Sequence, residues 1–399
     1  MCKVLYVHHG GAEGGAPKSL RFLLEKLPKD KFSSAILCIT EPKENKRAFG
    51  PLTGNFYYEH WIAPFHGNTV CGVRGFFPAL VQLMKVPLSV LNAMKYIRKE
   101  KPQIVHINST CLWPAAVAAK LCDRNIKVIC LVREPLADSF CGRKIRKMCK
   151  KYADGFVAID AYDLNSLELT DQRYKVIYNF VDFAAYDSAL VSDVLRRECG
   201  IPQTATVLLF LARLSPFNGA LAMIEHMHAF LEERKDVHLC IVGLRETESD
   251  YAKRLIAAVA KHENAHLVAF RTDVPQMIAS SDIMIVPFLK PHFARSIIEA
   301  AAMGVPSLAS DMGGLSELIV PGSTGMLFDS ETFADFIPKL RKMVDDSEFR
   351  RRLGQNAERY AKENFSASIN AKATFDFYEQ VYGKELAKSK KSAERKALH

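Results

Sequence analysis

The feature that most constrains the fold is an alternation of short apolar strands with helical segments that runs twice along the chain. The first series opens with a buried-strand pattern at 3–7. The second opens at 205–212, after a linker-like segment at 179–187. Strands that alternate with helices are typical of parallel, doubly wound sheets, and 399 residues are too many for one compact core. We therefore predict an α/β chain of two Rossmann-like, doubly wound domains that face each other across a cleft.

Domain limits follow from where the pattern restarts and ends. The N-terminal domain is expected at 1–183 and the C-terminal domain at 184–364. Residues 365–383 read as one amphipathic helix that crosses back to the N-terminal domain, and the basic tail 384–399 is expected to be disordered because it lacks an apolar face. The expected strands after the first are 33–39, 103–108, 127–132, 155–159 and 175–179 in the first half, and 205–212, 238–243, 266–270, 282–288 and 306–310 in the second.

Charge and cysteine content restrict the partners. Lys and Arg exceed Asp and Glu by 54 to 44, a formal charge of +10 that favours anionic partners such as nucleotides, phosphates or an acidic membrane. No basic run interleaves with aromatics, so nucleic acid is not expected. The ten cysteines form no Cys-x-x-Cys pair or zinc spacing, which predicts no metal site and a reducing, cytoplasmic location. The apolar start is too short for a signal peptide, and no charge-free apolar run reaches about 18 residues, so no transmembrane helix is expected.

Four consecutive pieces of the second half are the most specific. They read LFLARLSPFNG from 209, HLCIVG from 238, DVPQMIASSDIMIVPF from 273 and PHFARSIIEAAAMGVPSLASDMGG from 291. Together with GGAPKSL, IVHINST and VIYNFVD in the first half, they resemble family-4 glycosyltransferases of the GT-B type. The resemblance implies retaining transfer of a sugar from a nucleotide-sugar, UDP-sugar by default, to a glycan or lipid-linked acceptor in cell-surface polysaccharide or glycolipid synthesis. It implies neither a cofactor nor a metal.

Three residues are predicted to act on the donor. The helix expected from Arg295 would present unpaired backbone N–H groups to a diphosphate. Glu299, one turn in, can accept hydrogen bonds from ribose hydroxyls, and the resemblance implies that role; a salt-bridge glutamate is the alternative. Arg213 follows the strand at 205–212 with a bidentate fork suited to phosphate, and the resemblance places the diphosphate there. We name Arg213, Glu299 and Arg295 as catalytic candidates.

The remaining candidates flank these positions. Glycines allow close backbone approach to a ligand, and the glycine-rich loop at 10–15 is expected to approach the donor phosphates through its N–H groups. The further donor-side candidates are Gly11, Gly15, Asn218, Gly219, Phe270, His292, Phe293, Ala294 and Ser296, and the acceptor-side candidates are Gly14, His106, Arg133 and Glu134.

The chain departs from the family pattern at several positions. Asn218 replaces the usual lysine, Pro291 replaces a glutamate that contacts the donor sugar, Ala294 replaces a glycine, and Arg133-Glu134-Pro135 replaces an HD-type pair. We expect Arg295 to supply the second cation and His292 to take over sugar contact. The alternative is a non-catalytic relative that binds a nucleotide or a partner. A different two-Rossmann enzyme, an epimerase or a phosphorylase, is a third reading, and no context for a pyridoxal lysine is found.

The segment 73–99 combines apolar and basic residues: Phe76, Phe77, Leu80, Leu83 and Met84 with Arg74, Lys85, Lys95, Arg98 and Lys99. Pro78 and Pro87 are expected to break it into short pieces that lie on a bilayer without spanning it. We therefore expect peripheral contact with anionic lipid on the inner face of the membrane. A core helix, particularly at 89–99, is the alternative.

Overall fold

The computed structural model describes residues 1–11, 14–69, 76–245 and 247–397. The chain forms two compact units. The first comprises residues 1–179 together with the C-terminal segment from Ala367, and the second comprises Phe180–Ser366. The division falls four residues before the boundary expected from the sequence.

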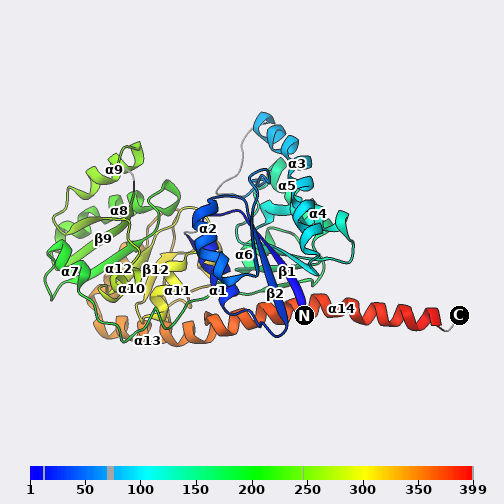
Figure 1. Cartoon of the computed structure of the whole chain (residues 1–399). Helices are drawn as coiled ribbons and strands as arrows, with labels where there is room; N and C mark the ends of the chain where they lie inside the picture. Colours follow the sequence, from blue (N-terminus) through cyan, green and yellow to red (C-terminus); the bar gives the residue numbers. More distant parts are fainter. Residues whose placement is uncertain (12–13, 70–75, 246, 398–399) are drawn as a thin grey trace. The chain divides into compact units, whose positions relative to one another are not determined.

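The N-terminal unit, which contains β1 and β2 in Figure 1, is built on a seven-stranded sheet. The strand order is β3-β2-β1-β4-β5-β6-β7, and every pair of neighbours is parallel. Its strands are β1 (Cys2–His8), β2 (Phe32–Cys38), β3 (Asn55–Tyr58), β4 (Ile104–Ile107), β5 (Lys127–Val132), β6 (Gly155–Ala158) and β7 (Tyr174–Val176). Its helices are α1 (Gly15–Glu25), α2 (Pro42–Phe49), α3 (Phe76–Glu100), α4 (Trp113–Cys122), α5 (Phe140–Tyr152), α6 (Ala161–Asn165) and α14 (Ala367–Ala397).

Alternating side chains of this sheet enter two different layers. Leu5 and Val7 belong to the core formed with α3, α4 and α5. Tyr6, between them, lies on the opposite face, where its ring is 5.1 Å from that of His106 and where the Tyr378 hydroxyl of α14 contacts His106. Both faces are therefore covered, as a parallel sheet requires.

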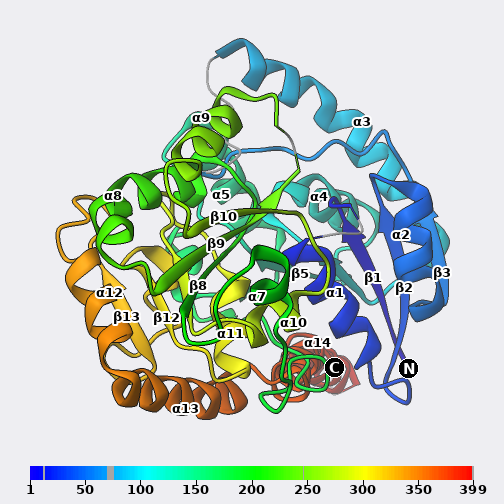
Figure 2. The ribbon, with the colours of Figure 1, turned by 90° about the vertical axis from the view of Figure 1, so that its left-hand side faces the viewer.

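The C-terminal unit repeats the plan with six parallel strands in the order β10-β9-β8-β11-β12-β13. Helices α8, α9 and α12 share a core with one face, and α12 and α13 lie beside β13 (Figure 2). The strands are β8 (Thr206–Leu211), β9 (Val237–Leu244), β10 (Ala265–Ala269), β11 (Ile283–Val286), β12 (Ser307–Ser310) and β13 (Gly325–Phe328). The helices are α7 (Val194–Cys199), α8 (Ala220–Glu233), α9 (Asp250–Val259), α10 (Val274–Ala279), α11 (Arg295–Ala302), α12 (Phe336–Asp345) and α13 (Ser347–Asn364).

Two strands were not predicted from the sequence. Both β3 and β13 are four-residue strands at a sheet edge. The residues of β3 are at most half-buried, and β13 begins with a glycine, so neither shows a clear apolar run. The strand expected at 175–179 is shorter than expected and covers only Tyr174–Val176.

Two helices are longer than expected. The prediction that Pro78 and Pro87 divide the segment 73–99 is wrong: from Phe76 to Glu100 it is one helix. Pro78 falls in the first turn, where no N–H bond is lost, and Pro87 removes one hydrogen bond that packing of this helix on α4 offsets. Residues 73–75 lie outside the described part. The helix expected to end at 383 continues as α14 to Ala397, where a disordered tail was predicted, because residues 384–397 are mostly strong helix formers and include no Gly or Pro.

The strand order locates one switch point in each sheet. In the C-terminal unit, the chain leaves β8 toward β9 on one side and leaves β11 toward β12 on the other. In the N-terminal unit, β1 and β4 are related in the same way. Ligands of doubly wound sheets bind at the carboxyl ends of such strand pairs, so the loops after β8, β11, β1 and β4 are where a site is expected.

Candidate functional site

The loops that follow β8 and β11 are joined to each other. The N–H of Leu289 donates a hydrogen bond of 2.8 Å to the carbonyl of Phe217. Gly219 has φ of +74°, and a Cβ there would lie 1.8 Å from the carbonyl oxygen of Pro287. Both the positive φ and the backbone approach exclude other residues at this position. Gly219 therefore fixes the spacing of the two loops at the switch point.

Arg213 is the cation of the β8 loop. Its side chain is exposed and makes no hydrogen bond or ion pair with any residue in the described ranges. The loop itself is held, because the buried Asn218 amide donates a 2.7 Å hydrogen bond to the Arg213 carbonyl. A guanidinium on a fixed backbone with no internal partner is available to a phosphate.

Asn218 stabilises the loop that follows β8. From the sequence alone, Asn218→Lys is expected to be neutral or mildly helpful, because it would restore the family's lysine. The hydrogen bond from Asn218 to the Arg213 carbonyl reverses that expectation. A lysine that leaves the loop to reach a ligand would release this carbonyl, so Asn218→Lys is expected to loosen the loop that carries Arg213.

Glu299 lies in a buried cluster at the start of α11. Its carboxylate is 3.3 Å from Nε of Arg295, and the side chains are only 7% and 12% exposed. The second end of the Arg295 guanidinium donates to the carbonyl of Phe180 at 2.9 Å. Tyr186 also bonds to Glu299, and burial followed by the charge of Glu299 raises the pKa of Tyr186. The carboxylate is thus held in place one turn into the helix, as expected, by a salt bridge that the sequence reading left as the alternative role.

The prediction for Arg295 is a loss of turnover. Arg295→Ala is expected to lower kcat/KM for the donor at least tenfold, about 1.4 kcal/mol, because it removes a cation at the helix start and frees Glu299. Arg295→Lys retains the charge but cannot hold Glu299 and the Phe180 carbonyl together, so it should recover only part of the loss. Full kcat/KM in Arg295→Ala, measured with steady-state kinetics, would contradict the assignment.

The N-terminus of α11 has no side-chain cap. Ala294 at the cap position and Ser296 are buried, and Phe293 is half-buried. The preceding loop is ordered by His292, whose ring stacks on Phe288 at 4.2 Å and whose Nδ1 contacts the Lys290 carbonyl at 2.9 Å. Burial lowers the pKa of His292. The start of this helix therefore carries no side-chain cap that a ligand would have to displace.

Phe270 follows β10 on the same edge of the sheet. It is partly exposed, and the guanidinium of Arg245, which follows β9, lies 3.5 Å from the centre of its ring. A flat, cation-backed aromatic surface at a carboxyl edge suits an aromatic base. The donor-side candidates of this unit thus come from the ends of β8, β10 and β11.

The glycine-rich loop follows β1 at the other switch point. It is anchored by Thr40 and Asn45, which donate to the Gly10 carbonyl at 2.7 and 3.1 Å. Gly14 has φ of +112° and precedes Gly15, the first residue of α1, which has no side-chain cap. Gly11 is half-buried, and its carbonyl is 3.4 Å from His8 Nε2. Backbone N–H groups at the start of α1 thus lie at the carboxyl edge of the sheet.

Arg133 and Glu134 follow β5, which is separated from β1 by β4 in the sheet order. Arg133 donates to Asn179 at 3.4 Å, and Asn68 donates to the Glu134 carboxylate. Burial raises the pKa of Glu134, and the charge of Arg133 offsets part of that rise. Both side chains are half-buried at the carboxyl edge.

The assignment of His106 to the acceptor side is corrected by its position. It is fully buried within β4, and its Nδ1 is 2.6 Å from the Tyr378 hydroxyl. Burial, followed by the charge of Arg133, lowers its pKa to about 3. Every residue of β4 is buried, so the side chain of His106 enters the core under α14 and is not presented at the loop.

Several residues of these sites were missed in the sequence. Nothing in the sequence marks Tyr186 as a site residue, because only the folded structure brings the segment 179–187 to Glu299. His8 is the last residue of β1, and His9 follows it directly before the glycines. Two histidines at the end of a predicted strand were a signal for a site. Asn108 contacts Nδ1 of His8 at 2.9 Å, and burial lowers the pKa of His8 to about 3 and that of His9 to about 4. These rings are neutral at pH 7 and order the first switch point.

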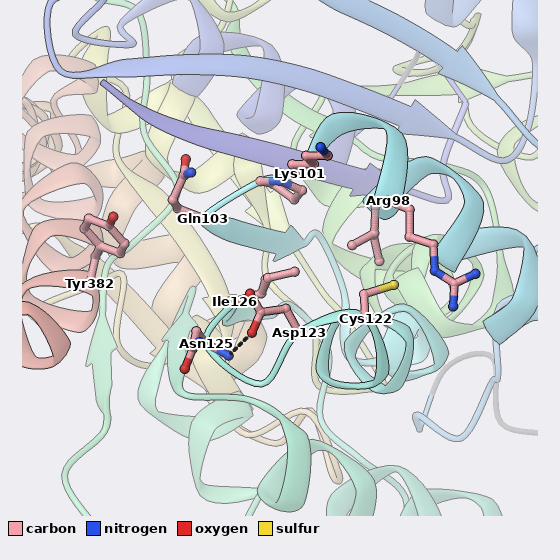
Figure 3. Close-up of a pocket in the computed structure, with 10 residues that line it drawn as sticks. Arg98, Lys101, Gln103, Cys122, Asp123, Asn125, Ile126 and Tyr382 are labelled. Carbon is pink, nitrogen blue, oxygen red and sulfur yellow. Dashed lines mark hydrogen bonds between the residues drawn. The ribbon is translucent and has the colours of Figure 1, made fainter. Parts of the chain in front are cut away.

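A separate cavity of about 560 Å³ lies in the N-terminal unit (Figure 3). Its lining includes Gln103 and Ile126, which precede β4 and β5, and Tyr382 of α14. Asp123 in its wall accepts a hydrogen bond from the Asn125 N–H at 2.8 Å. The cavity therefore opens at the amino ends of the strands, on the edge opposite the glycine-rich loop.

Comparisons with known proteins cover both units. Residues 13–185 match the family model described as glycosyltransferase family 4, and residues 191–360 match that described as glycosyl transferases group 1.

Among the described residues, no group of three or more His, Cys, Asp or Glu side chains is arranged to hold a metal ion.

The chain is also similar to several known proteins. The UDP-Gal:alpha-D-GlcNAc-diphosphoundecaprenol alpha-1,3-galactosyltransferase of Escherichia coli is 25% identical over 81% of this chain and 82% of its own length. The D-inositol 3-phosphate glycosyltransferase of Corynebacterium efficiens is 28% identical over 52% of this chain, and the match spans about half of that relative (51%). The crystal structure of Anabaena HepE in complex with UDP has a TM-score of 0.74 at 20% identity, covering 95% of this chain and 100% of that one. That likeness shows the fold.

Proposed function

The chain belongs to the family-4 glycosyltransferases of the two-Rossmann type, and from this we propose that it transfers a sugar from a UDP-sugar, with retention, to a glycan or lipid-linked acceptor. The observation that carries the proposal is the arrangement at the β8–β11 switch point. There, the exposed Arg213 guanidinium, the uncapped start of α11 and the buried Glu299 carboxylate follow adjacent strands. A cation beside a helix N-terminus suits a diphosphate, and a carboxylate suits a ribose.

The chain's own groups would act mainly on the leaving group. The bond between the anomeric carbon and the diphosphate oxygen breaks, and Arg213 together with the α11 N–H groups stabilises the charge that develops on the diphosphate. The acceptor oxygen bonds to the anomeric carbon on the face that the diphosphate leaves, and its proton passes to a phosphate oxygen. No protein nucleophile is required.

The acceptor is proposed to be lipid-linked. The Escherichia coli relative is named for a diphosphoundecaprenol acceptor, and the formal charge of +10 favours anionic partners. The nine described cysteines are free, as in a reducing compartment. We place the reaction on the cytoplasmic face of the membrane, in cell-surface polysaccharide or glycolipid synthesis.

The experiment is a panel of UDP-, GDP- and ADP-sugars assayed for hydrolysis and transfer, with thermal shifts against the free nucleotides. UDP at saturating excess is expected to stabilise the protein by roughly 2–4 kcal/mol, and a UDP-sugar is expected to turn over. Nucleotide stabilisation without turnover of any donor would instead support a non-catalytic binding relative, the reading favoured by Asn218 and Pro291 at the family's Lys and Glu positions. Turnover of a GDP- or ADP-sugar alone would overturn the choice of base.

The reaction is expected to continue in EDTA. The Arg213 guanidinium and the N-terminus of α11 can neutralise the diphosphate in place of a divalent ion. Initial rates measured after chelation and dialysis should match those of untreated enzyme. Loss of activity that Mn²⁺ or Mg²⁺ restores would contradict this part of the proposal.

A further inference from the structure

Helix α3 exposes an apolar stripe. Phe77, Met84 and Leu91 are 73%, 71% and 65% exposed, and Leu80, Val81 and Leu88 are exposed between them. These six residues, the α3 stripe, are spaced three, four and seven apart and share one side of the helix. The exposed side of a surface helix is ordinarily polar, and a contiguous apolar patch there marks an interaction site.

The opposite side of α3 is already used by the fold. Val90, Ala93 and Ile97 lie in the core shared with α4 and the sheet. Within the described part of the chain, α3 is the one helix with the length and apolar composition of a membrane span, over Phe77–Glu100. Crossing a bilayer would pull these core residues off α4. The stripe is therefore suited to lie on an apolar partner while α3 stays packed.

Positive charge continues the stripe and flanks it. Lys95, Arg98 and Lys99 lie on the same side of α3 in its last turns and are exposed. Helix α5 carries six Lys or Arg and no acid between 139 and 153, and the Phe140 at its start is 55% exposed. Gln82 of α3 contacts Cys141 of α5, and the views in Figures 1 and 2 place the two helices in the same layer as α4.

We propose that the α3 stripe and the basic side of α5 form one docking surface for an anionic lipid bilayer. The stripe enters the boundary between headgroups and acyl chains, and the cations of both helices contact lipid phosphates. A second copy of the chain is a poorer occupant, because a two-fold interface would place these positive charges opposite themselves. Docking uses none of the donor-site residues, so its test is separate from that of the sugar transfer.

The test is flotation of the full chain with vesicles of phosphatidylcholine alone and of phosphatidylcholine mixed with phosphatidylglycerol. Binding to the mixed vesicles is expected to be at least about tenfold tighter and to weaken in high salt, where the screening length falls to about 3 Å at 1 M. The combined variant Phe77→Ser, Met84→Ser, Leu91→Ser should lose binding to both vesicle types. The variant Lys144→Glu, Lys147→Glu, Lys151→Glu should lose only the preference for phosphatidylglycerol.

Matched controls use exposed positions in the C-terminal unit. Val191→Ser and Lys261→Glu change exposed residues outside the surface and should bind vesicles like the wild type. Circular dichroism melts verify that each variant is folded. Equal binding to the two vesicle types, or equal losses in surface and control variants, overturns the proposal. So does a dimer that the triple serine variant converts to monomer without any wild-type vesicle binding, which would assign the stripe to self-association.

Discussion

Glu299→Ala is expected to remove most of the affinity for nucleotide while the C-terminal unit stays folded. The carboxylate is buried on the first turns of α11 and held by Arg295 and Tyr186, so it is pre-positioned to accept two hydrogen bonds from a ribose. Loss of an acceptor that bonds through its charge costs about 2–3 kcal/mol, a roughly 30- to 150-fold rise in Kd. Titration calorimetry with UDP measures it.

The same substitution also leaves Arg295 without its ion-pair partner. Breaking a buried pair destabilises a protein by up to about 3–5 kcal/mol, and the Phe180 carbonyl, which Arg295 keeps, limits the loss. Glu299→Gln is the matched variant, because its amide oxygen can still accept from Arg295 or Tyr186 with little change in shape. Exposed Glu263→Ala serves as the control for charge alone. A Kd for UDP that stays unchanged in Glu299→Ala would show that the carboxylate is only structural.

Strand positions were predictable wherever several apolar β-branched residues followed one another. The strand at 127–132 is confirmed residue for residue, and the start of α11 at Arg295 was also placed correctly. The edge strands β3 and β13 could not be found this way, since their residues are few or partly exposed. The prolines of α3 led to a wrong prediction of short pieces. The free energy that a proline costs a helix depends on its position in the helix and on packing, and the sequence does not show that packing.

Site residues, too, could be predicted only where their position along a strand or loop was enough to locate them. Residues in loops after strands, such as Arg213 and Gly219, could be located at the carboxyl edge because parallel strands bring their carboxyl ends to one edge. His106 was misassigned because its strand is buried on both faces, and sequence alone does not say which way a side chain points. Tyr186 joins Glu299 only through tertiary structure, and the role of Asn218 as a brace of its own loop required its hydrogen bond to be seen.

Arg213→Ala is expected to have the largest effect on catalysis. Arg295 is paired with Glu299 at 3.3 Å, so its charge is largely compensated before any ligand binds. Arg213 has no acidic partner in the ranges that the structure describes, and Asn218 fixes the loop that carries it. Its charge is therefore the main one available to the diphosphate as the donor bond breaks.

Removing one pre-positioned donor to a developing anion costs roughly 100- to 1000-fold in kcat, and we expect a loss of that size for Arg213→Ala. Because the charge develops during the reaction, kcat should fall more than KM for the donor rises. Arg213→Lys should recover part of the loss, since it restores the charge without the fork. Exposed Arg359→Ala on α13 makes the same change of net charge and should be neutral. If Arg213→Ala keeps kcat within about twofold, or loses no more than Arg359→Ala, the diphosphate is stabilised elsewhere and the β8 loop has only a structural role.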